Sequence, residues 1–113
     1  MKTNQFVSRS PGVELAVLRQ HPDGGMTFLF RMEQGARSER HEHPGGEETY
    51  LITGKLRIDR RVDANGQPAP DVVLSAGEYV FVPPNEVHEG FAEEATTFLV
   101  VAPGGIVPTH KAG

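Results

Sequence analysis

The sequence predicts an all-β domain, folded as a sandwich or a barrel, from three observations. Glycine and proline are abundant, at 13 and 9 of 113 residues, and they interrupt the chain about every 8 to 12 residues. The runs between them are short and rich in β-branched and aromatic residues. No stretch keeps a 3.6-residue hydrophobic period over three turns, which argues against amphipathic helices. Many short strands separated by Gly and Pro turns are typical of all-β architectures.

The predicted strands follow one another with turn signals between them. Val13–Leu18 and Met26–Met32 flank the turn His21–Gly25, whose Pro-Asp-Gly-Gly composition is that of a hairpin loop. The polar loop Asp63–Pro70 carries an Asn-Gly signal and predicts a second hairpin. The other predicted strands are Glu48–Thr53, Lys55–Val62, Val72–Leu74, Glu78–Val82 and Thr96–Val101.

Length and composition narrow the class of protein. We expect one domain over residues 1–113, since a chain of this size forms a single core. No apolar run is long enough to span a membrane, and the first dozen residues lack the apolar segment of a secretory signal. We therefore expect a cytoplasmic protein without a membrane partner. The absence of cysteine excludes disulfides, thiolate metal sites and cysteine nucleophiles.

The charge distribution argues against a nucleic-acid partner. Fifteen acidic and eleven basic residues give a net charge of -4, with no tryptophan and two tyrosines. Basic residues do gather in sequence, but acidic residues are interleaved with them, so we expect a solvated surface of mixed charge. These basic residues are Arg37, Arg40, Arg57, Arg60 and Arg61.

Two predicted strands are apolar on both faces. Tyr50–Ile52 and Phe98–Val101 break the alternation expected of a strand with one face in water. A small protein that buries the second face of a sheet often does so against another subunit, so we expect a homodimer. The segment Pro103–Gly113 has no periodicity and is predicted to be a mobile end or an arm along a partner.

Three of the five histidines are arranged so that they can share a ligand. His41 and His43 are two residues apart, so on a strand both imidazoles project from one face. Glu47 follows the tight turn Pro44–Gly46, which lets the next strand bring a carboxylate back to the same pocket. Glu48 points to the opposite face if that strand begins here.

His88 completes the set from a distant part of the chain. It follows the rigid segment Pro83–Asn85, which fixes the approach of a loop at a strand end. Three imidazoles and one carboxylate predict a metal site. His21 lies in the hairpin turn and His110 in the C-terminal segment, and we expect neither to be functional.

The spacing of these residues resembles the two sequence motifs of the cupin superfamily. The first motif corresponds to residues 35–54, where five, one, three and six residues separate its defining positions Gly35, His41, His43, Glu47 and Gly54. The second corresponds to residues 77–92, with its defining positions at Gly77, Pro83, Asn85 and His88. The distance to Gly54 selects Glu47 over Glu48 as the ligand.

Two positions depart from the family pattern, and one short segment resembles a particular subgroup of the family. Asn85 replaces a glycine, which is tolerable because Asn accepts left-handed conformations, and Ala92 replaces an asparagine outside the ligands. The segment His43–Leu51 resembles the zinc-binding cupin domain of a singlet-oxygen-responsive anti-sigma factor, the ChrR-like cupins. Members of that subgroup also resemble acetylacetone-cleaving dioxygenases.

This resemblance implies a conical antiparallel β-barrel, also called a double-stranded β-helix or jelly roll, that is often dimeric. It implies one divalent metal ion per chain, Fe, Mn, Ni, Co or Zn, in the wider mouth, with His41, His43, Glu47 and His88 as ligands. Three neutral imidazoles and one carboxylate leave the ion with a net charge of about +1, which favours a small anionic oxygen ligand at its open positions.

The sequence leaves the function open between classes. We favour a dioxygenase-type oxidoreductase acting on a small oxygenated anion. The alternatives are a non-catalytic module that binds or senses a small molecule, and an isomerase or lyase that uses the metal as a Lewis acid. The helical sigma-binding domain of the anti-sigma factor is not found here, which favours the enzyme.

No general base is singled out by the sequence. The candidates near the motifs are Glu48, Tyr50 and Tyr79, and which of them faces the pocket depends on strand register. Four basic residues are candidates for holding an anionic substrate: Arg31, Arg37, Arg40 and Arg57.

Overall fold

All regular secondary structure in the computed structural model, which describes residues 5–108, is antiparallel β-strand. The strands are β1 (Val7–Ser10), β2 (Val13–Gln20), β3 (Met26–Met32), β4 (His41–Glu42), β5 (Glu47–Val62), β6 (Pro68–Ala69), β7 (Val72–Ser75), β8 (Tyr79–Val82), β9 (Val87–Ala102) and β10 (Val107–Pro108). None of the described residues belongs to a helix long and apolar enough to cross a membrane.

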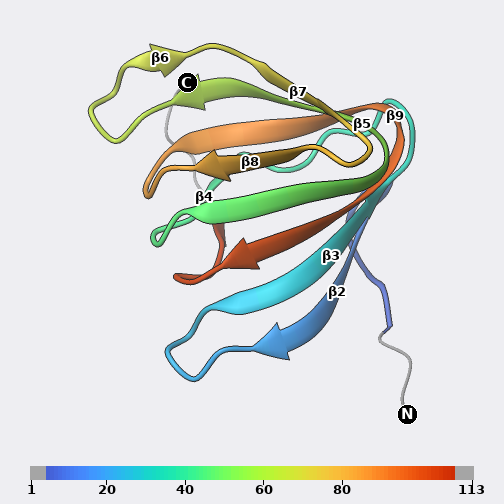
Figure 1. Ribbon diagram of the computed structural model, residues 1–113, viewed down its shortest axis with the longest axis horizontal. Helices are drawn as coiled ribbons and strands as arrows, with labels where there is room; N and C mark the ends of the chain where they lie inside the picture. Colours follow the sequence, from blue (N-terminus) through green and yellow to red (C-terminus); the bar gives the residue numbers. More distant parts are fainter. Residues whose placement is uncertain (1–4, 109–113) are drawn as a thin grey trace.

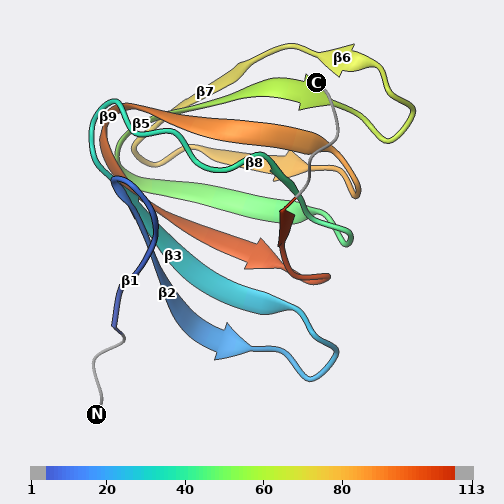
Figure 2. The same cartoon turned by 180° about the vertical axis from the view of Figure 1, so that it is seen from behind.

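The two longest strands, β5 and β9, each take part in both layers of the fold. Residues 47–50 of β5 pair with β8, and residues 55–58 pair with β7. Residues 87–88 of β9 pair with β4, and residues 96–102 pair with β3. Figures 1 and 2 show the layers meeting at one end, where the long strands bend from one layer into the other. The predicted all-β antiparallel barrel of the jelly-roll type is confirmed.

Gly54 makes the bend in β5 possible. Its φ is +85°, in the left-handed region that glycine adopts without strain. A Cβ atom at this position would collide with the carbonyl oxygen of Ala95 on β9. The pairing register between β5 and β9 also shifts at this position, between Thr53 and Lys55. The two strands predicted on either side of Gly54 are therefore one continuous, bent strand.

The predicted strand boundaries agree best where apolar residues dominate. Met26–Met32 is observed as predicted, and both hairpin turns are present, closed by hydrogen bonds from His21 N to Gly25 O and from Asp63 N to Gln67 O. Only the second half of β9 was predicted. Its first half contains several glutamates and a glycine, a composition typical of a loop. It forms a strand paired with β5, and the neighbouring Arg37, Arg57 and Arg60 bind the carboxylates of Glu89 and Glu93.

The core lies between the two layers and reaches the predicted metal ligands. The rings of Phe28 and Phe98 each pack against Phe30, with centroids 5.2 Å apart in both pairs. The other buried apolar core residues are Val13, Leu15, Met32, Leu51, Leu56, Ile58, Leu74, Val82, Ala92, Val100 and Ala102. Phe30 and Phe98 extend this core to a cavity beside His41.

We predicted that these basic residues lie on a solvated surface of mixed charge. This prediction is wrong where they bind buried carboxylates. Arg37 donates hydrogen bonds to both carboxylate oxygens of Asp59, at 2.7 and 3.1 Å, and to Glu89 at 3.1 Å. Asp59 and Glu89 are only 6% and 8% exposed. Each pair joins residues from different strands or loops, so proximity in sequence does not reveal it. These ion pairs are part of the barrel wall rather than a solvated face.

The outer face of the sheet carries the apolar residues that led us to expect a dimer. Tyr50 and Ile52 on β5 are 46% and 44% exposed, and Tyr79 and Phe81 on the neighbouring β8 are 54% and 52% exposed. Leu51, between the first two, is fully buried in the core. The apolar character of both faces of this segment is therefore present, and the homodimer itself stays a prediction.

The segment after β9 returns to the barrel. β10 pairs with β4, with Val107 opposite Glu42 and Pro108 opposite His41. The described part of the predicted C-terminal tail thus lies along the strand that carries a predicted ligand. Residues 109–113, and with them His110, lie outside the described residues.

Candidate metal centre

The four predicted ligands come together at one place in the barrel. One ligand atom from each of His41, His43, Glu47 and His88 lies within 4.8 Å of the others, and all four residues are buried. His41 is on β4, His43 follows it, Glu47 begins β5, and His88 is on β9. Four residues of the described chain can therefore hold one metal ion, and they come from β4, the turn that follows it, β5 and β9.

Two turns fix the positions of the ligands. The amide of Gly46, at φ +80°, donates to the carbonyl of His43 at 2.9 Å and closes the turn that leads to Glu47. The amide of Asn85 donates to the same carbonyl at 3.1 Å, which ties the turn before His88 to the turn after His43. Asn85 has a φ of +65°, so it adopts the left-handed conformation expected of the glycine it replaces.

Backbone carbonyls orient two of the imidazoles. The Nδ1 atom of His41 is 2.7 Å from the carbonyl oxygen of Glu39, and that of His43 is 3.1 Å from the carbonyl oxygen of Gly105. A carbonyl accepts only, so each Nδ1 carries the proton and each Nε2 keeps a lone pair. Metal-binding histidines are typically held in this way, with the outer nitrogen donating to a fixed acceptor.

The atoms that face one another in the centre lack hydrogen bonds of their own. The Nε2 atoms of His43 and His88 both lie 2.9 Å from Oε1 of Glu47. Nevertheless, Nε2 of His43 and Oε1 of Glu47 are buried and have no aligned hydrogen-bond partner among the described residues. Thr49 donates to the other oxygen, Oε2, at 2.7 Å and leaves Oε1 directed at the histidines. Unsatisfied buried polar atoms cost about 1–3 kcal/mol each, and a shared cation would satisfy them.

Burial and mutual contact separate the protonation states of the ligands. Burial, with the neighbouring His88 and His43, lowers the pKa of His41 to about 3, so this ring stays neutral. Burial also acts to lower the pKa of His88, but contacts with Glu47 and Glu86 outweigh it and raise that pKa to about 9. Burial opposes ionisation of Glu47, yet its close contacts with His43 and His88 hold its pKa well below the usual range. The site therefore attracts positive charge.

Sequence reasoning missed one buried carboxylate next to the ligands. Glu86 is 2% exposed, and its Oε1 lies 3.3 Å from Nδ1 of His88. Arg61 donates to both oxygens of Glu86, at 2.8 and 2.9 Å. Burial acts to raise the pKa of Glu86, but His88 and Arg61 hold it below the ordinary value. Its position two residues before His88, on the same side of the chain, was the available signal.

A small cavity of about 20 Å³ borders three of the ligands. Its lining combines those ligands with apolar side chains: Phe30, Ser38, His41, Glu47, Thr49, Leu56, Ile58, His88, Gly90 and Phe98. A second space of about 10 Å³ shares Phe30, Ser38 and His41 with it, and Arg9, Ser10, Glu39 and Ile106 also line it. A water molecule needs about 10–15 Å³, so the space beside the ligands accepts only very small molecules.

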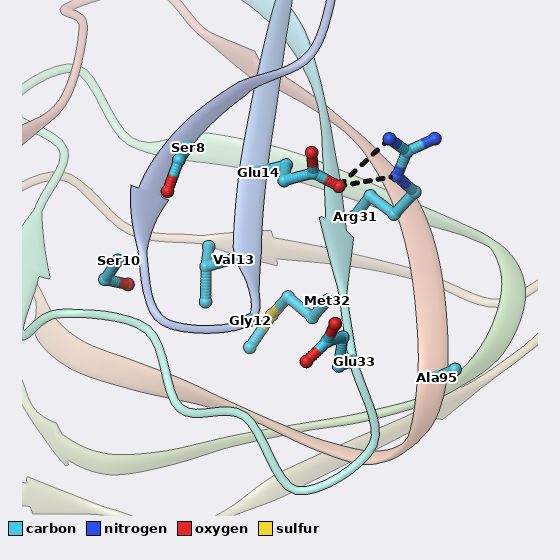
Figure 3. Close-up of a pocket in the computed structure, with 9 residues that line it drawn as sticks. All are labelled: Ser8, Ser10, Gly12, Val13, Glu14, Arg31, Met32, Glu33 and Ala95. Carbon is cyan, nitrogen blue, oxygen red and sulfur yellow. Dashed lines mark hydrogen bonds and ion pairs between the residues drawn. The ribbon is translucent and has the colours of Figure 1, made fainter.

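A larger hollow of about 520 Å³ lies outside the barrel and contains none of the predicted ligands. Figure 3 shows it between the β1–β2 hairpin and β3, beside the exposed ion pair of Glu14 and Arg31. Glu33 also lines it, and no buried polar group of the predicted site faces it. The predicted ligands therefore border the smaller cavity and not this hollow.

The candidate bases lie on the outer face of the barrel, away from the ligands. Glu48, Tyr50 and Tyr79 are all exposed, and the hydroxyl of Tyr79 donates to Oε1 of Glu48 at 2.9 Å. None of the three lines the cavity beside the ligands. The register therefore sends Glu47 inward and Glu48 outward, as the first motif predicts.

The four basic candidates for holding a substrate are engaged elsewhere. Arg31 pairs with Glu14, Arg37 with Asp59 and Glu89, and Arg57 with Asp59 and Glu93, while Arg40 donates to the carbonyl of Arg60 and pairs with Glu89. None of them lines the cavity beside the ligands. Arg9, which sequence reasoning did not single out, lines the adjoining space that leads to His41.

Residues 1–107 match the sequence profile of the family described as the ChrR cupin-like domain. The chain belongs to this cupin family. The predicted resemblance to the cupin superfamily, and to its ChrR-like branch, is confirmed. A search of curated proteins gives no significant match.

Solved structures show the same fold at low sequence identity. KdgF from Halomonas sp. matches with a TM-score of 0.66 and 19% identity over 87% of each chain. An RmlC-like cupin from Shewanella frigidimarina matches with a TM-score of 0.70 and 18% identity, over 96% of this chain and 86% of the other. A single-residue variant of oxalate decarboxylase from Bacillus subtilis matches with a TM-score of 0.73 and 22% identity over 89% of this cupin, which spans 28% of that longer chain.

Proposed function

We propose that this cupin binds one divalent metal ion through His41, His43, Glu47 and His88 and acts as a dioxygenase-type oxidoreductase on a small oxygenated anion. One observation carries the proposal. Four buried ligand atoms converge within 4.8 Å, two of them without hydrogen-bond partners in the described chain, at the wall of a cavity that four apolar side chains also line. An all-N/O donor set of this kind suits first-row divalent metals.

The four residues would offer the ion different kinds of ligand atom. His41 and His43 offer neutral nitrogens oriented by backbone carbonyls, and Glu47 offers a carboxylate oxygen directed by Thr49. A bound ion would supply a Lewis acid, and iron or manganese would also supply redox chemistry. A manganese centre is described for the oxalate decarboxylase of Bacillus subtilis, a structural neighbour, which makes manganese one of the metals to test.

The cavity lining favours oxygen chemistry over proton transfer. Phe30, Phe98 and Ile58 give the cavity apolar walls, and apart from the ligands only the hydroxyls of Ser38 and Thr49 bring polar side chains to the described lining. An isomerase or lyase needs a positioned acid or base with a pKa near the working pH. Neither hydroxyl meets that requirement, so the dioxygenase is the stronger proposal.

The size of the cavity supports a second candidate, a non-catalytic sensor or binding module. A space of about 20 Å³ is far below the roughly 300 Å³ of a common small-molecule pocket. A substrate larger than a few atoms would fit only if side chains that line this cavity or the adjoining space moved. A sensor, by contrast, needs only a metal whose binding alters the barrel mouth.

One experiment separates these candidates. The metal-free protein is reconstituted anaerobically with Fe(II), Mn(II), Co(II), Ni(II) or Zn(II), and oxygen uptake is measured with β-diketones, flavonols and hydroxy-acids. Oxygen consumption that needs both metal and organic substrate supports the dioxygenase. Binding of one of these compounds without turnover, with every metal, supports the sensor. The His41→Ala, His43→Ala double variant is the control and is expected to show neither.

A further inference from the structure

The three histidines of the candidate metal centre differ in what holds their outer nitrogen. Nδ1 of His41 and of His43 each faces a backbone carbonyl, at 2.7 and 3.1 Å. Nδ1 of His88 instead faces a carboxylate, Oε1 of Glu86, at 3.3 Å. It is buried, and no aligned hydrogen bond from the described residues occupies it. The Glu86 carboxylate is therefore the acceptor available to this ring.

Glu86 is itself held rigidly. Both of its oxygens accept from the guanidinium of Arg61, at 2.8 and 2.9 Å, which is the bidentate geometry that fixes a carboxylate in its plane. Arg61 donates a further hydrogen bond to the carbonyl of Pro70, so the guanidinium is anchored to the chain beyond β6. The side chains of Glu86 and Arg61 are 2% and 11% exposed. The contact between Arg61 and Glu86 is therefore largely shielded from water.

We propose that Glu86, locked by Arg61, is a positioning residue that fixes the ring of His88 and strengthens its binding to the metal. A carboxylate behind a ligating imidazole selects the nitrogen that faces the metal and makes the ring a better electron donor. The negative charge also adds to that of Glu47 and so increases the attraction of the site for a cation. This inference rests on the proposed function, because it assigns a role to residues behind one of its ligands.

The competing explanation is that Glu86 and Arg61 only join β9 to β5. A matched control distinguishes the two roles, because Asp59 is also a buried carboxylate, 6% exposed, and accepts two hydrogen bonds from the guanidinium of Arg37, from another part of the chain. Asp59 contacts none of the four predicted ligands in the described structure. Asp59→Asn therefore removes a comparable ion pair without touching the metal centre.

The test compares the wild-type protein with Glu86→Gln, Glu86→Ala and Asp59→Asn. Zn(II) and Co(II) affinities are measured by competition with a chelator at constant pH, and unfolding is measured on the metal-free proteins. Loss of a group that supports a ligand typically lowers metal affinity about 10–100-fold, and we expect this for Glu86→Ala. Glu86→Gln keeps the shape and an acceptor but loses the charge, so its loss should be smaller. Asp59→Asn should lose stability and keep its metal affinity.

A second readout does not depend on metal. NMR relaxation of the Cε1–H group of His88 in the metal-free protein reports whether the ring is held, and it should show an ordered ring in the wild type and in Asp59→Asn. The ring should become mobile in Glu86→Ala. Glu86→Gln keeps an acceptor, so it should show a smaller gain in ring mobility over the wild type, and this smaller gain is the readout if the alanine variant does not fold.

The outcomes for the proposed function and for this inference are distinct. A wild-type protein that binds none of the metals overturns the proposed function, and the relaxation experiment then decides on positioning by itself. Wild-type metal binding, together with Glu86 variants that match wild-type affinity within about twofold and keep the His88 ring ordered, would overturn the role of Glu86.

Discussion

His41 and His88 are directly opposed across the antiparallel pair of β4 and β9, with ring centroids 4.5 Å apart and ring planes 79° apart. β4 is only two residues long, so this opposition depends on the pairing of a very short strand. β10 pairs with the other edge of β4 and places Pro108 opposite His41. The candidate metal centre is thus built by strand register, and a change in that register would separate its ligands.

Replacing His88 with alanine should abolish stoichiometric metal binding. His88 is the one predicted ligand that comes from the second half of the chain, so the remaining residues cannot reproduce its position. Elemental analysis of the purified protein should give about one metal per chain for the wild type and almost none for His88→Ala. His21→Ala is the control, because His21 contacts Thr27 through Nε2 at 2.8 Å and lies outside the centre. Full metal content in His88→Ala would show that the assignment is wrong.

Removing the metal should lower the free energy of unfolding. The buried atoms at the centre, among them Nε2 of His43 and Oε1 of Glu47, have no aligned hydrogen-bond partners in the described chain. A ligand that binds only the native state stabilises it by about 2.7 kcal/mol at a free concentration 100 times its Kd. Thermal unfolding with increasing Zn(II) or Mn(II) should therefore show a rising Tm.

The same titration on the His41→Ala, His43→Ala variant provides the control for that prediction. Its Tm should not respond to the metal, because two of the four ligand atoms are missing. A wild-type Tm that also fails to respond would mean that the convergence of the four side chains serves the apolar core rather than a cation.

Three of the four predicted ligands could be grouped by short-range geometry, whereas His88 was joined to them through the segment Pro83–Asn85 and the second cupin motif. Two histidines at alternate positions share one face of any strand, and the turn before Glu47 returns the chain to that face. The distance from Glu47 to Gly54 also carries information, since Gly54 marks the bend at which β5 passes between layers. The resemblance to the first cupin motif selects Glu47, and the alternation of side chains along the strand then directs Glu47 inward and Glu48 outward.

The groups behind the ligands were not predictable in the same way. Glu86 is held by Arg61, 25 residues away in sequence, and this pairing exists only once β5 and β9 have folded together. The first half of β9 was missed for the same reason, because its charged residues favour a loop until arginines on other elements neutralise them. Amino-acid composition indicates whether a segment lies at the surface or in the core. It does not reveal a buried ion pair, which depends on tertiary contacts.

Gly54→Ala should destabilise the fold and disturb the metal centre. Alanine at a φ of +85° is strained, at a cost of about 1–3 kcal/mol, and its Cβ would collide with the carbonyl oxygen of Ala95. Chemical denaturation should show a loss at least as large as the strain. Gly66→Ala is the matched control, since Gly66 has a φ of +80° but no atom within 4 Å of an added Cβ. Equal losses in the two variants would contradict a special role for the contact with Ala95.

Asp59 should make stability depend on pH in the acid range. Burial acts to raise its pKa, but hydrogen bonds from Arg37 and Arg57 outweigh this and lower the pKa below the ordinary value of 3.8. A carboxylate whose pKa is lower in the folded state stabilises the protein above its unfolded-state pKa, and the effect is lost as the pH falls through the folded-state pKa.

The measurement compares the wild type with Asp59→Asn by urea denaturation. At pH 7 the variant should be less stable by about 2 kcal/mol, the scale of hydrogen bonds to a charged group. The difference should begin to shrink near pH 4 and continue to fall below it. A difference that stays constant from pH 7 to pH 3 would show that the ionisation of Asp59 is not linked to folding.

The outer face of the sheet should mediate a homodimer. Strand register places Leu29 on β3, Leu99 on β9, Tyr50 on β5 and Tyr79 on β8 in one row across four adjacent strands. An apolar row of this kind is self-complementary under a two-fold axis, which suits an isologous interface. Sedimentation of the wild-type protein at micromolar concentration should give the mass of a dimer. Tyr50→Arg places a charge at the centre of the row and should give a monomer with an unchanged core, whereas Val73→Arg, outside the row on β7, should remain dimeric. A monomeric wild-type protein would rule out this interface.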